Sequence, residues 1–303
     1  MKQLLASIVF IICSLFVVDR VGEKVMWWIN QNTSDVSGPK LKYMVNQANE
    51  DVIMLGASRC SRHYVSSILS DSLGMSVYNA GIDASENIYS HYITLNMILS
   101  HHTPKMVCLE LMRDDYALEA NSFTSVSFFA PYIGIDNAID SVFMDSGNYW
   151  PYMFCHLYRY TAKAISNIGG FFVNKQQHND NGYIPIPQPY SFPDKLNTMH
   201  TIHNVDTLKL QYIQRFINQC KSRNIELVFT VSPQYMYAEK DLYDVLKNVA
   251  QDNSIPFFDY HSQGLYIDHP EYFKDIFHLW DKGARLYSSV FAHDLKEYLD
   301  QKN

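Results

Sequence analysis

The sequence has few of the features that bind nucleic acid or hold a metal through sulfur. Its 303 residues carry 24 Lys and Arg against 31 Asp and Glu, a formal net charge of −7, and no basic cluster is present. Nucleic-acid surfaces need clustered Lys and Arg to meet phosphates, so this composition argues against a nucleic-acid partner. The five cysteines include no Cys-x-x-Cys pair, which argues against a thiolate metal site. We expect no metal and no other cofactor.

No signal-peptidase site follows the apolar run at the N-terminus. Residues 4–18 are apolar or small, and Asp19 ends the run. Fifteen residues are fewer than the roughly 20 that span a bilayer, so a signal-peptide core and a short anchor both fit. The charged stretch that follows has no Ala-x-Ala, which favours a retained anchor and an exported domain. We interpret residues 1–31 as this anchor plus an interfacial helix, with Trp27 and Trp28 suited to the headgroup region.

The remainder of the chain alternates apolar runs with amphipathic stretches. A linker at 32–49 leads into a domain at 50–303, in which strands are predicted at 52–55, 75–79, 106–111, 225–231 and 256–259, and helices at 60–73, 86–100, 205–223, 240–252 and 282–300. This rhythm predicts an α/β fold with three layers, α/β/α, around a parallel five-stranded sheet with right-handed crossovers.

The alternation stops in an insertion at about 116–203. Residues 150–168 have a helical pattern, and residues 174–197 form a polar, proline-rich stretch that predicts a loop. Long loops in compact domains are often functional. The insertion could be a lid or an acceptor-binding region, or it could be a decoration that shields the sheet, and the sequence leaves both open.

A short apolar run ends in a turn of small residues that presents Ser58. Residues 51–59 read Asp-Val-Ile-Met-Leu-Gly-Ala-Ser-Arg, which indicates a buried strand followed by a helix. Ser58 would lie between the carboxyl end of the strand and a helix N-terminus, where open α/β sheets place their chemistry and N–H groups can hold an oxyanion. A serine that only caps the helix would look the same.

An acid and a histidine stand three residues apart near the C-terminus. Asp275 and His278 lie in Phe-Lys-Asp-Ile-Phe-His and are followed by a Gly-Ala pair and a terminal helix. A serine nucleophile needs a base, and the base needs an acid that fixes its tautomer. Asp-x-x-His alone is weak evidence. Together with the strand-ending Gly-x-Ser upstream, it indicates a triad of Ser58, His278 and Asp275.

These blocks resemble those of the SGNH (GDSL-like) hydrolase superfamily. Residues 56–58, Gly-Ala-Ser, are similar to its first block, with Ala where many members carry Asp. Residues 78–81, Tyr-Asn-Ala-Gly, resemble the second block, and residues 275–278 resemble the last. The resemblance covers 50–298 and implies a flavodoxin-like sheet and an ester-directed serine mechanism.

The same resemblance implies an oxyanion hole made by the N–H groups of Ser58 and Gly81, with Asn79 as a further candidate. The third block of the superfamily, Gly-x-Asn-Asp, supplies another donor and has no counterpart here, because the third strand is followed by Arg113 and acidic residues. Loss of one donor typically costs about 100- to 1,000-fold in rate. Either Arg113 replaces the asparagine, or the activity is low or lost.

Three residues at strand ends are candidates for substrate binding: Arg59, Arg113 and Tyr235. Arg59 could bind a substrate carboxylate or phosphate, or it could pair with Asp83 or Glu110. The ion pair is the interpretation that we favour.

Two other histidines compete weakly for a role in the site. His63, five residues after Ser58, could face the pocket, but a surface or packing role is favoured. Asp259 and His261 end a strand and could form an acid–base pair, although no Gly-Ala turn follows them.

The sequence supports two functional hypotheses. The first is a membrane-tethered serine esterase or O-acyltransferase, outside the cytoplasm, acting on acyl groups, such as acetyl, of a cell-surface polysaccharide through an acyl-serine intermediate. Gly-x-Ser-Arg with an N-terminal membrane segment is similar to the cell-envelope branch that assists polysaccharide O-acylation and teichoic acid D-alanylation. The second is a weakly active or inactive protein of the same fold that binds glycan or partners a multi-pass membrane acyltransferase.

Overall fold

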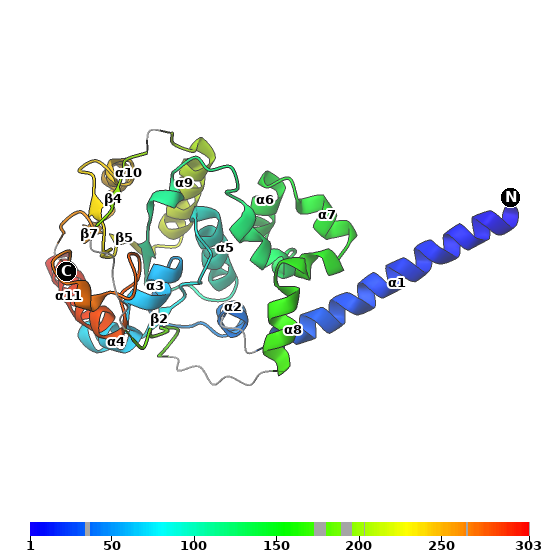
Figure 1. The fold of residues 1–303 in the computed structure, drawn as a ribbon, viewed down its shortest axis with the longest axis horizontal. Coiled ribbons are helices and arrows are strands. Elements are labelled where there is room, and N and C mark those ends of the chain that lie inside the picture. Colours follow the sequence, from blue (N-terminus) through cyan, green and yellow to red (C-terminus); the bar gives the residue numbers. More distant parts are fainter. Residues whose placement is uncertain (34–36, 173–179, 189–195, 203, 265, 303) are drawn as a thin grey trace. The chain divides into compact units, whose positions relative to one another are not determined.

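The computed structural model describes residues 1–33, 37–172, 180–188, 196–202, 204–264 and 266–302 (Figure 1). The chain divides into two compact units. The first comprises Met1–Tyr43 and Val126–Gln176, and the second comprises Met44–Ser125 and Gln177–Asn303. The sequence predicts one domain at 50–303 with an insertion at 116–203, whereas the structure groups the middle of that insertion with the N-terminal segment.

A parallel sheet of five strands forms the centre of the second unit. Its strands are β1 (Val52–Leu55), β2 (Val77–Asn79), β3 (Met106–Glu110), β5 (Glu226–Val231) and β7 (Phe257–Asp259), in the spatial order β2-β1-β3-β5-β7. Every residue of β1, β2 and β3 is buried, as expected for strands covered on both faces. The predicted α/β fold with five parallel strands is confirmed.

Helices cover both faces of this sheet (Figure 1). On one face α3 (Ser58–His63), α4 (Ser66–Leu73) and α11 (Asp281–Lys302) pack together, and on the other α5 (Ile88–Leu99) packs against α9 (Thr207–Ser222). The unit also contains α10 (Asp244–Asp252), the short helices η1 (Arg113–Asp115) and η4 (Pro270–Tyr272), and a small sheet of β4 (Thr198–Met199) with β6 (Tyr237–Ala238).

The single helix predicted at 60–73 is wrong, because the chain breaks between α3 and α4. Tyr64 and Val65 have extended backbone angles. The side chain of Asn79 donates to the carbonyl of Tyr64 over 2.8 Å, and Ser288 Oγ accepts from Val65 N over 2.8 Å. Side chains distant in sequence therefore take up the main-chain groups that a continuous helix would have paired internally.

The first unit is helical. It contains α1 (Lys2–Asn32), most of η2 (Thr124–Tyr132), α6 (Asn137–Asp145), α7 (Tyr149–Phe154), η3 (Leu157–Lys163) and α8 (Ala164–Phe172). The helix predicted at 150–168 is thus divided among α7, η3 and α8. Among the described residues, α1 is the one helix long and apolar enough to cross a membrane. The expected linker at 32–49 contains a helix, α2 (Ser37–Asn46), which tolerates its proline because that residue lies in the first turn.

The described part of the proline-rich stretch lies against the edge of the sheet. Asn79 N donates to Asn181 O over 2.8 Å, and Ile184 N donates to Ser61 O over 3.0 Å. Residues 180–188 therefore run beside β2 and α3, and they do not line the cavity described below. The expected loop at 174–197 also includes 174–179 and 189–195, which lie outside the described residues.

Candidate active site

Ser58 stands at the point where the strand order reverses. The chain passes from β1 to β2 on one side and then to β3 on the other side of β1, so the carboxyl end of β1 opens into a crevice. Gly56 makes the turn possible with φ of +155°, and a Cβ there would lie 2.8 Å from Cβ of Glu110. Ser58 then begins α3, which places its side chain and its N–H at the edge of the crevice.

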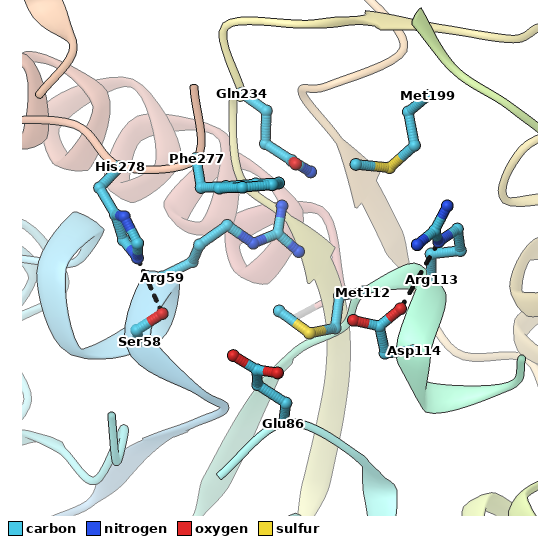
Figure 2. Close-up of a pocket in the computed structure, with 10 residues that line it drawn as sticks. All are labelled: Ser58, Arg59, Glu86, Met112, Arg113, Asp114, Met199, Gln234, Phe277 and His278. Carbon is cyan, nitrogen blue, oxygen red and sulfur yellow. Dashed lines mark hydrogen bonds and ion pairs between the residues drawn. The ribbon is translucent and has the colours of Figure 1, made fainter. Parts of the chain in front are cut away.

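The structure brings Ser58, His278 and Asp275 together (Figure 2). Ser58 Oγ lies 2.8 Å from His278 Nε2, and both carboxylate oxygens of Asp275 lie 3.0 Å from His278 Nδ1. A carboxylate can only accept from Nδ1, which places the ring proton on Nδ1 and leaves Nε2 as an acceptor for the serine proton. This arrangement has the geometry of an acyl-transfer triad.

The loop that carries His278 is fixed by its own main chain. Asp275 Oδ1 accepts from the N–H groups of Phe277 and His278 over 2.8 and 2.9 Å, and Lys274 N donates to His278 O over 2.7 Å. Burial by itself would raise the pKa of Asp275. The hydrogen bond and the positive charge of His278, together with the N–H groups of Phe277 and His278, lower it by more, so the pKa lies below its usual value. Asp275 therefore remains an anion that orients the imidazole.

A cavity of about 310 Å³ opens beside the serine. It is lined by Ser58, Arg59, Glu86, Met112, Arg113, Asp114, Met199, Gln234, Phe277 and His278. In Figure 2 the serine and histidine occupy one end and the ion pair of Arg113 and Asp114, 3.5 Å apart, occupies the other. The mixture of apolar walls and charged groups suits a ligand with both an acyl group and polar substituents.

Arg59 belongs both to the cavity wall and to a buried ion pair. Its guanidinium lies 3.3 Å from Glu110 Oε1 and donates to Leu111 O over 2.8 Å. Burial alone would lower the pKa of Arg59, but attraction to Glu110 raises it, so the guanidinium stays charged. The favoured ion pair is thus present, with Glu110 as the partner, while Asp83 pairs with Arg62 instead.

His63 supports the loop that carries His278, a contact that the sequence interpretation missed. Leu279 N donates to His63 Nε2 over 2.9 Å, so the ring proton is on Nδ1, which lies 2.8 Å from Ser232 Oγ. Ser232 Oγ in turn donates to Glu110 Oε1 over 2.7 Å. Burial, reinforced by His278 and Arg59, lowers the pKa of His63 well below its usual value. A neutral, fully buried histidine therefore ties the residue after His278 to the ends of β3 and β5.

The three predicted oxyanion donors differ in whether their N–H groups already have an acceptor within the protein. Ser58 N–H lies in the first turn of α3, where helical N–H groups have no acceptor within the helix. Gly81 N–H donates to Asn79 Oδ1 over 3.0 Å. The amide nitrogen of Asn79 donates to the carbonyls of Cys60 and Tyr64 over 2.7 and 2.8 Å, so both of its hydrogens serve the main chain rather than an oxyanion.

Comparison with known proteins found similar structures only. No family model matches the chain, and no protein with a curated description matches it. A crystal structure from Bacteroides fragilis, with the provisional description of acylhydrolase, is 13% identical with a TM-score of 0.42, covering 86% of this chain and 95% of that one. A structure from Desulfitobacterium hafniense, provisionally described as a lipolytic protein of the G-D-S-L family, is 11% identical with a TM-score of 0.41, covering 80% and 97%. Similarity of this degree assigns no activity and no residue role.

Other expected residues lie outside the cavity wall. Tyr235 packs its ring 5.3 Å from that of Phe273 and donates its N–H to Ile276 O, so it supports the loop that carries Asp275 and His278 and does not line the cavity. Asp259 pairs with Lys247, and His261 is held by other groups, so these two do not form an acid–base pair with each other.

The cavity also contains residues that the sequence interpretation did not single out. Gln234 takes the place expected for Tyr235, and the strand end at 232–235 was the available signal for it. Glu86, in the loop before α5, and Met199, in the short strand β4, had no such signal. Among the described residues, His, Cys, Asp and Glu side chains do not gather in a group of three that could hold a metal.

Proposed function

We propose that this chain is a membrane-tethered serine esterase or O-acyltransferase that acts on small acyl groups of a cell-surface polysaccharide. The proposal rests on two contacts: Ser58 Oγ lies 2.8 Å from His278 Nε2, and His278 Nδ1 lies 3.0 Å from Asp275 Oδ1. A serine hydroxyl is by itself a poor nucleophile, and a base within hydrogen-bond reach activates it.

The chemistry follows from which atom holds the proton. As Ser58 Oγ attacks the acyl carbonyl carbon, its proton passes to His278 Nε2, and Asp275 stabilises the imidazolium that forms. The carbonyl π electrons move onto the oxygen and give a tetrahedral oxyanion. When this collapses, the alcohol leaves with the proton from His278, and an acyl-Ser58 ester remains. Water or a sugar hydroxyl then repeats the cycle and takes the acyl group, giving hydrolysis or transfer.

We infer that two groups stabilise the oxyanion. One is the N–H of Ser58, and the other is the guanidinium of Arg59, which Figure 2 shows extending into the cavity. Among the described residues, Arg59 Nε has no hydrogen-bond acceptor within reach. A fixed, water-shielded cation in the cavity wall would supply the stabilisation that an asparagine of the third block gives.

A pair of variants separates this role of Arg59 from its ion pair with Glu110. Arg59→Met leaves Glu110 buried without its cation and should destabilise the fold by about 3 to 5 kcal/mol. Arg59→Met combined with Glu110→Gln removes that charge and should recover stability, measured by urea denaturation. If Arg59 acts on the oxyanion, kcat of the double variant stays about 100- to 1,000-fold below wild type. Recovery of kcat together with stability would limit Arg59 to its ion pair.

The tether is supported by the way α1 joins the first unit. Trp27 packs 5.5 Å from Tyr132, and Asn30 accepts from Asn167 over 2.9 Å. The apolar half of the same continuous helix, 4–18, has its large hydrophobic side chains exposed. One half of α1 thus belongs to the folded unit while the other half offers an apolar surface of the kind that lipid covers.

A non-catalytic protein that binds glycan or partners a membrane acyltransferase is the second candidate. Two observations favour it: the N–H of Gly81 is directed to Asn79, and Glu110 ends β3 near the place where an asparagine donor is expected.

Activity-based labelling distinguishes the two candidates. A fluorophosphonate probe should label the wild type, and Ser58→Ala and His278→Ala should abolish labelling and lower hydrolysis of a generic acetyl ester by about 10⁴-fold or more. Ser61→Ala is the matched control, because Ser61 is a buried serine on the same helix whose hydroxyl has no partner among the described residues. Absence of both labelling and hydrolysis in the wild type would favour the binding protein.

A further inference from the structure

An exposed aromatic patch lies on α7 and at the start of η3. Trp150 and Phe154 are 64% and 77% exposed, with ring centroids 6.2 Å apart, and Tyr158 is 44% exposed. We call these three residues the α7 aromatic patch. Exposed aromatic side chains grouped in this way mark an interaction surface more often than scattered single residues do.

Hydrogen bonds fix the position of this patch along the length of α1. The carboxylate of Asp19 accepts from the N–H groups of His156 and Leu157 over 3.0 and 2.9 Å. One turn further along, Glu23 lies 2.6 Å from Nδ1 of His156. The segment between Phe154 and Tyr158 is therefore bonded to α1 at positions 19–23, directly after the apolar run ends.

The apolar run is shorter than a bilayer. Fifteen residues, 4–18, at 1.5 Å each give about 22 Å, against about 30 Å of hydrocarbon. A span that is too short draws the flanking residues into the interface or thins the bilayer around them. Positions 19–23 of α1 then lie at the level of the lipid headgroups, and so does the segment 155–157 that is hydrogen-bonded to them. The main-chain N–H groups at 156 and 157 help Asp19 to be accommodated there.

We propose that the α7 aromatic patch rests in the headgroup region of the bilayer that α1 crosses. Tryptophan and tyrosine are the side chains enriched at that depth, because their rings are apolar at one end and polar at the other. In Figure 1, α7 lies on the side of this unit from which the N-terminal end of α1 projects. Lipid is favoured over a protein partner because the chain between Phe154 and Tyr158 is bonded to α1 directly after its exposed apolar run. The inference rests on the proposed membrane tether.

The same unit offers an exposed apolar residue at a different height. Ile168, on α8, is 41% exposed. Its neighbour Asn167 donates to Asn30, which stands 11 residues after Asp19 and hence about 16 Å further along α1. Ile168 should lie above the headgroups and is the matched control.

Nitroxide labels in lipid nanodiscs test the proposal on the full chain. The two exposed native cysteines are Cys13 and Cys155, and the other three are buried. Cys155→Ser leaves Cys13 as the label site within the apolar run. Adding Cys13→Ser with either Phe154→Cys or Ile168→Cys moves the label to the patch or to the control. The measurement is the ratio of relaxation by oxygen, which enters lipid, to relaxation by a water-soluble nickel chelate.

We expect a ratio at position 154 between that at position 13 and that at position 168, and severalfold above the latter. A ratio at 154 equal to that at 168, with position 13 in the bilayer, would overturn the proposal while leaving the tether. Low ratios at all three positions would instead overturn the tether itself. A label at 154 that is sheltered in native membranes but water-exposed in pure lipid nanodiscs would assign the patch to a protein partner and refute the lipid assignment.

Discussion

Replacing Asp275 by Asn tests the proposed triad with the least disturbance of its geometry. The Asn oxygen can still accept from the N–H groups of Phe277 and His278, which now bond to Asp275 Oδ1. The charge that stabilises the imidazolium disappears, and the amide nitrogen also removes one of the two acceptors beside His278 Nδ1. Two unit charges about 4 Å apart interact by about 4 kcal/mol at an effective dielectric constant of 20. The Asp275 side chain is 45% exposed, which brings the expected loss toward about 2 kcal/mol.

A loss of about 2 to 4 kcal/mol corresponds to a fall in kcat/KM of about 30- to 1,000-fold. The assay is steady-state hydrolysis of an acetyl ester, with Tm recorded to show that the variant is folded. Asp281→Asn is the control. Asp281 accepts hydrogen bonds of 2.9 Å from Arg285 and from Tyr183 and is not part of the triad, so this variant should change kcat/KM less than about threefold. If folded Asp275→Asn keeps activity within threefold of wild type, the reasoning from the triad is refuted.

Three further predictions concern the support of the site, its pH dependence and the N-terminus. His63→Ala leaves Leu279 N–H without its buried acceptor and should lower kcat about 10- to 100-fold with little change in KM, whereas His63→Gln, which can accept, should recover most of it; equal loss in both variants would contradict this role. Burial lowers the pKa of His261 to about 4 in the folded state. As pH falls, the unfolded state therefore binds a proton before the folded state does. About 3 kcal/mol of stability should be lost between pH 6.5 and 4. Urea denaturation across that range should show a smaller loss for His261→Gln, and an unchanged loss would speak against the effect. Intact mass of the membrane-extracted protein should include residues 1–18, because the rest of α1 is packed into the first unit; a chain beginning after Val18 would show cleavage.

The sheet was predictable because each strand is a compact apolar run with a clear end. The first strand, 52–55, matches β1 residue for residue, and β3, β5 and β7 lie within a residue or so of their predictions. The second strand is shorter than expected, since β2 begins at Val77. Local pattern fails where distant side chains decide the backbone, as at Tyr64, whose carbonyl is taken by Asn79. The helices of the first unit were poorly predicted for the related reason that two of them, η3 and α8, pack against α1, far away in the chain.

The proximity of Ser58, Asp275 and His278 could be anticipated because each follows a recognisable element and carries a chemically specific side chain. The lining of the cavity could not. Glu86 stands in a loop and Met199 in the two-residue strand β4, and the positions of both depend on the tertiary fold. His63 was expected to have a surface or packing role, because nothing in its surrounding sequence shows that Leu279 N–H will meet its ring.

The acid at the end of β3 and the arginine after Ser58 make sense only together. An unpaired Glu110 at this depth would be costly, and burial does raise its pKa, although Arg59 and hydrogen bonds from Tyr64 and Ser232 oppose the rise. Because Gly56 lets the nucleophile turn approach Glu110, the carboxylate can hold the first turn of α3 through Arg59 and the loop after β5 through Ser232. A substitution at either partner should therefore be felt at Ser58, even though Glu110 itself lines no part of the cavity. The acid at the end of β3 is thus tied to the Gly-x-Ser-Arg turn by a physical contact, which is a reason to treat the two as one feature of this chain.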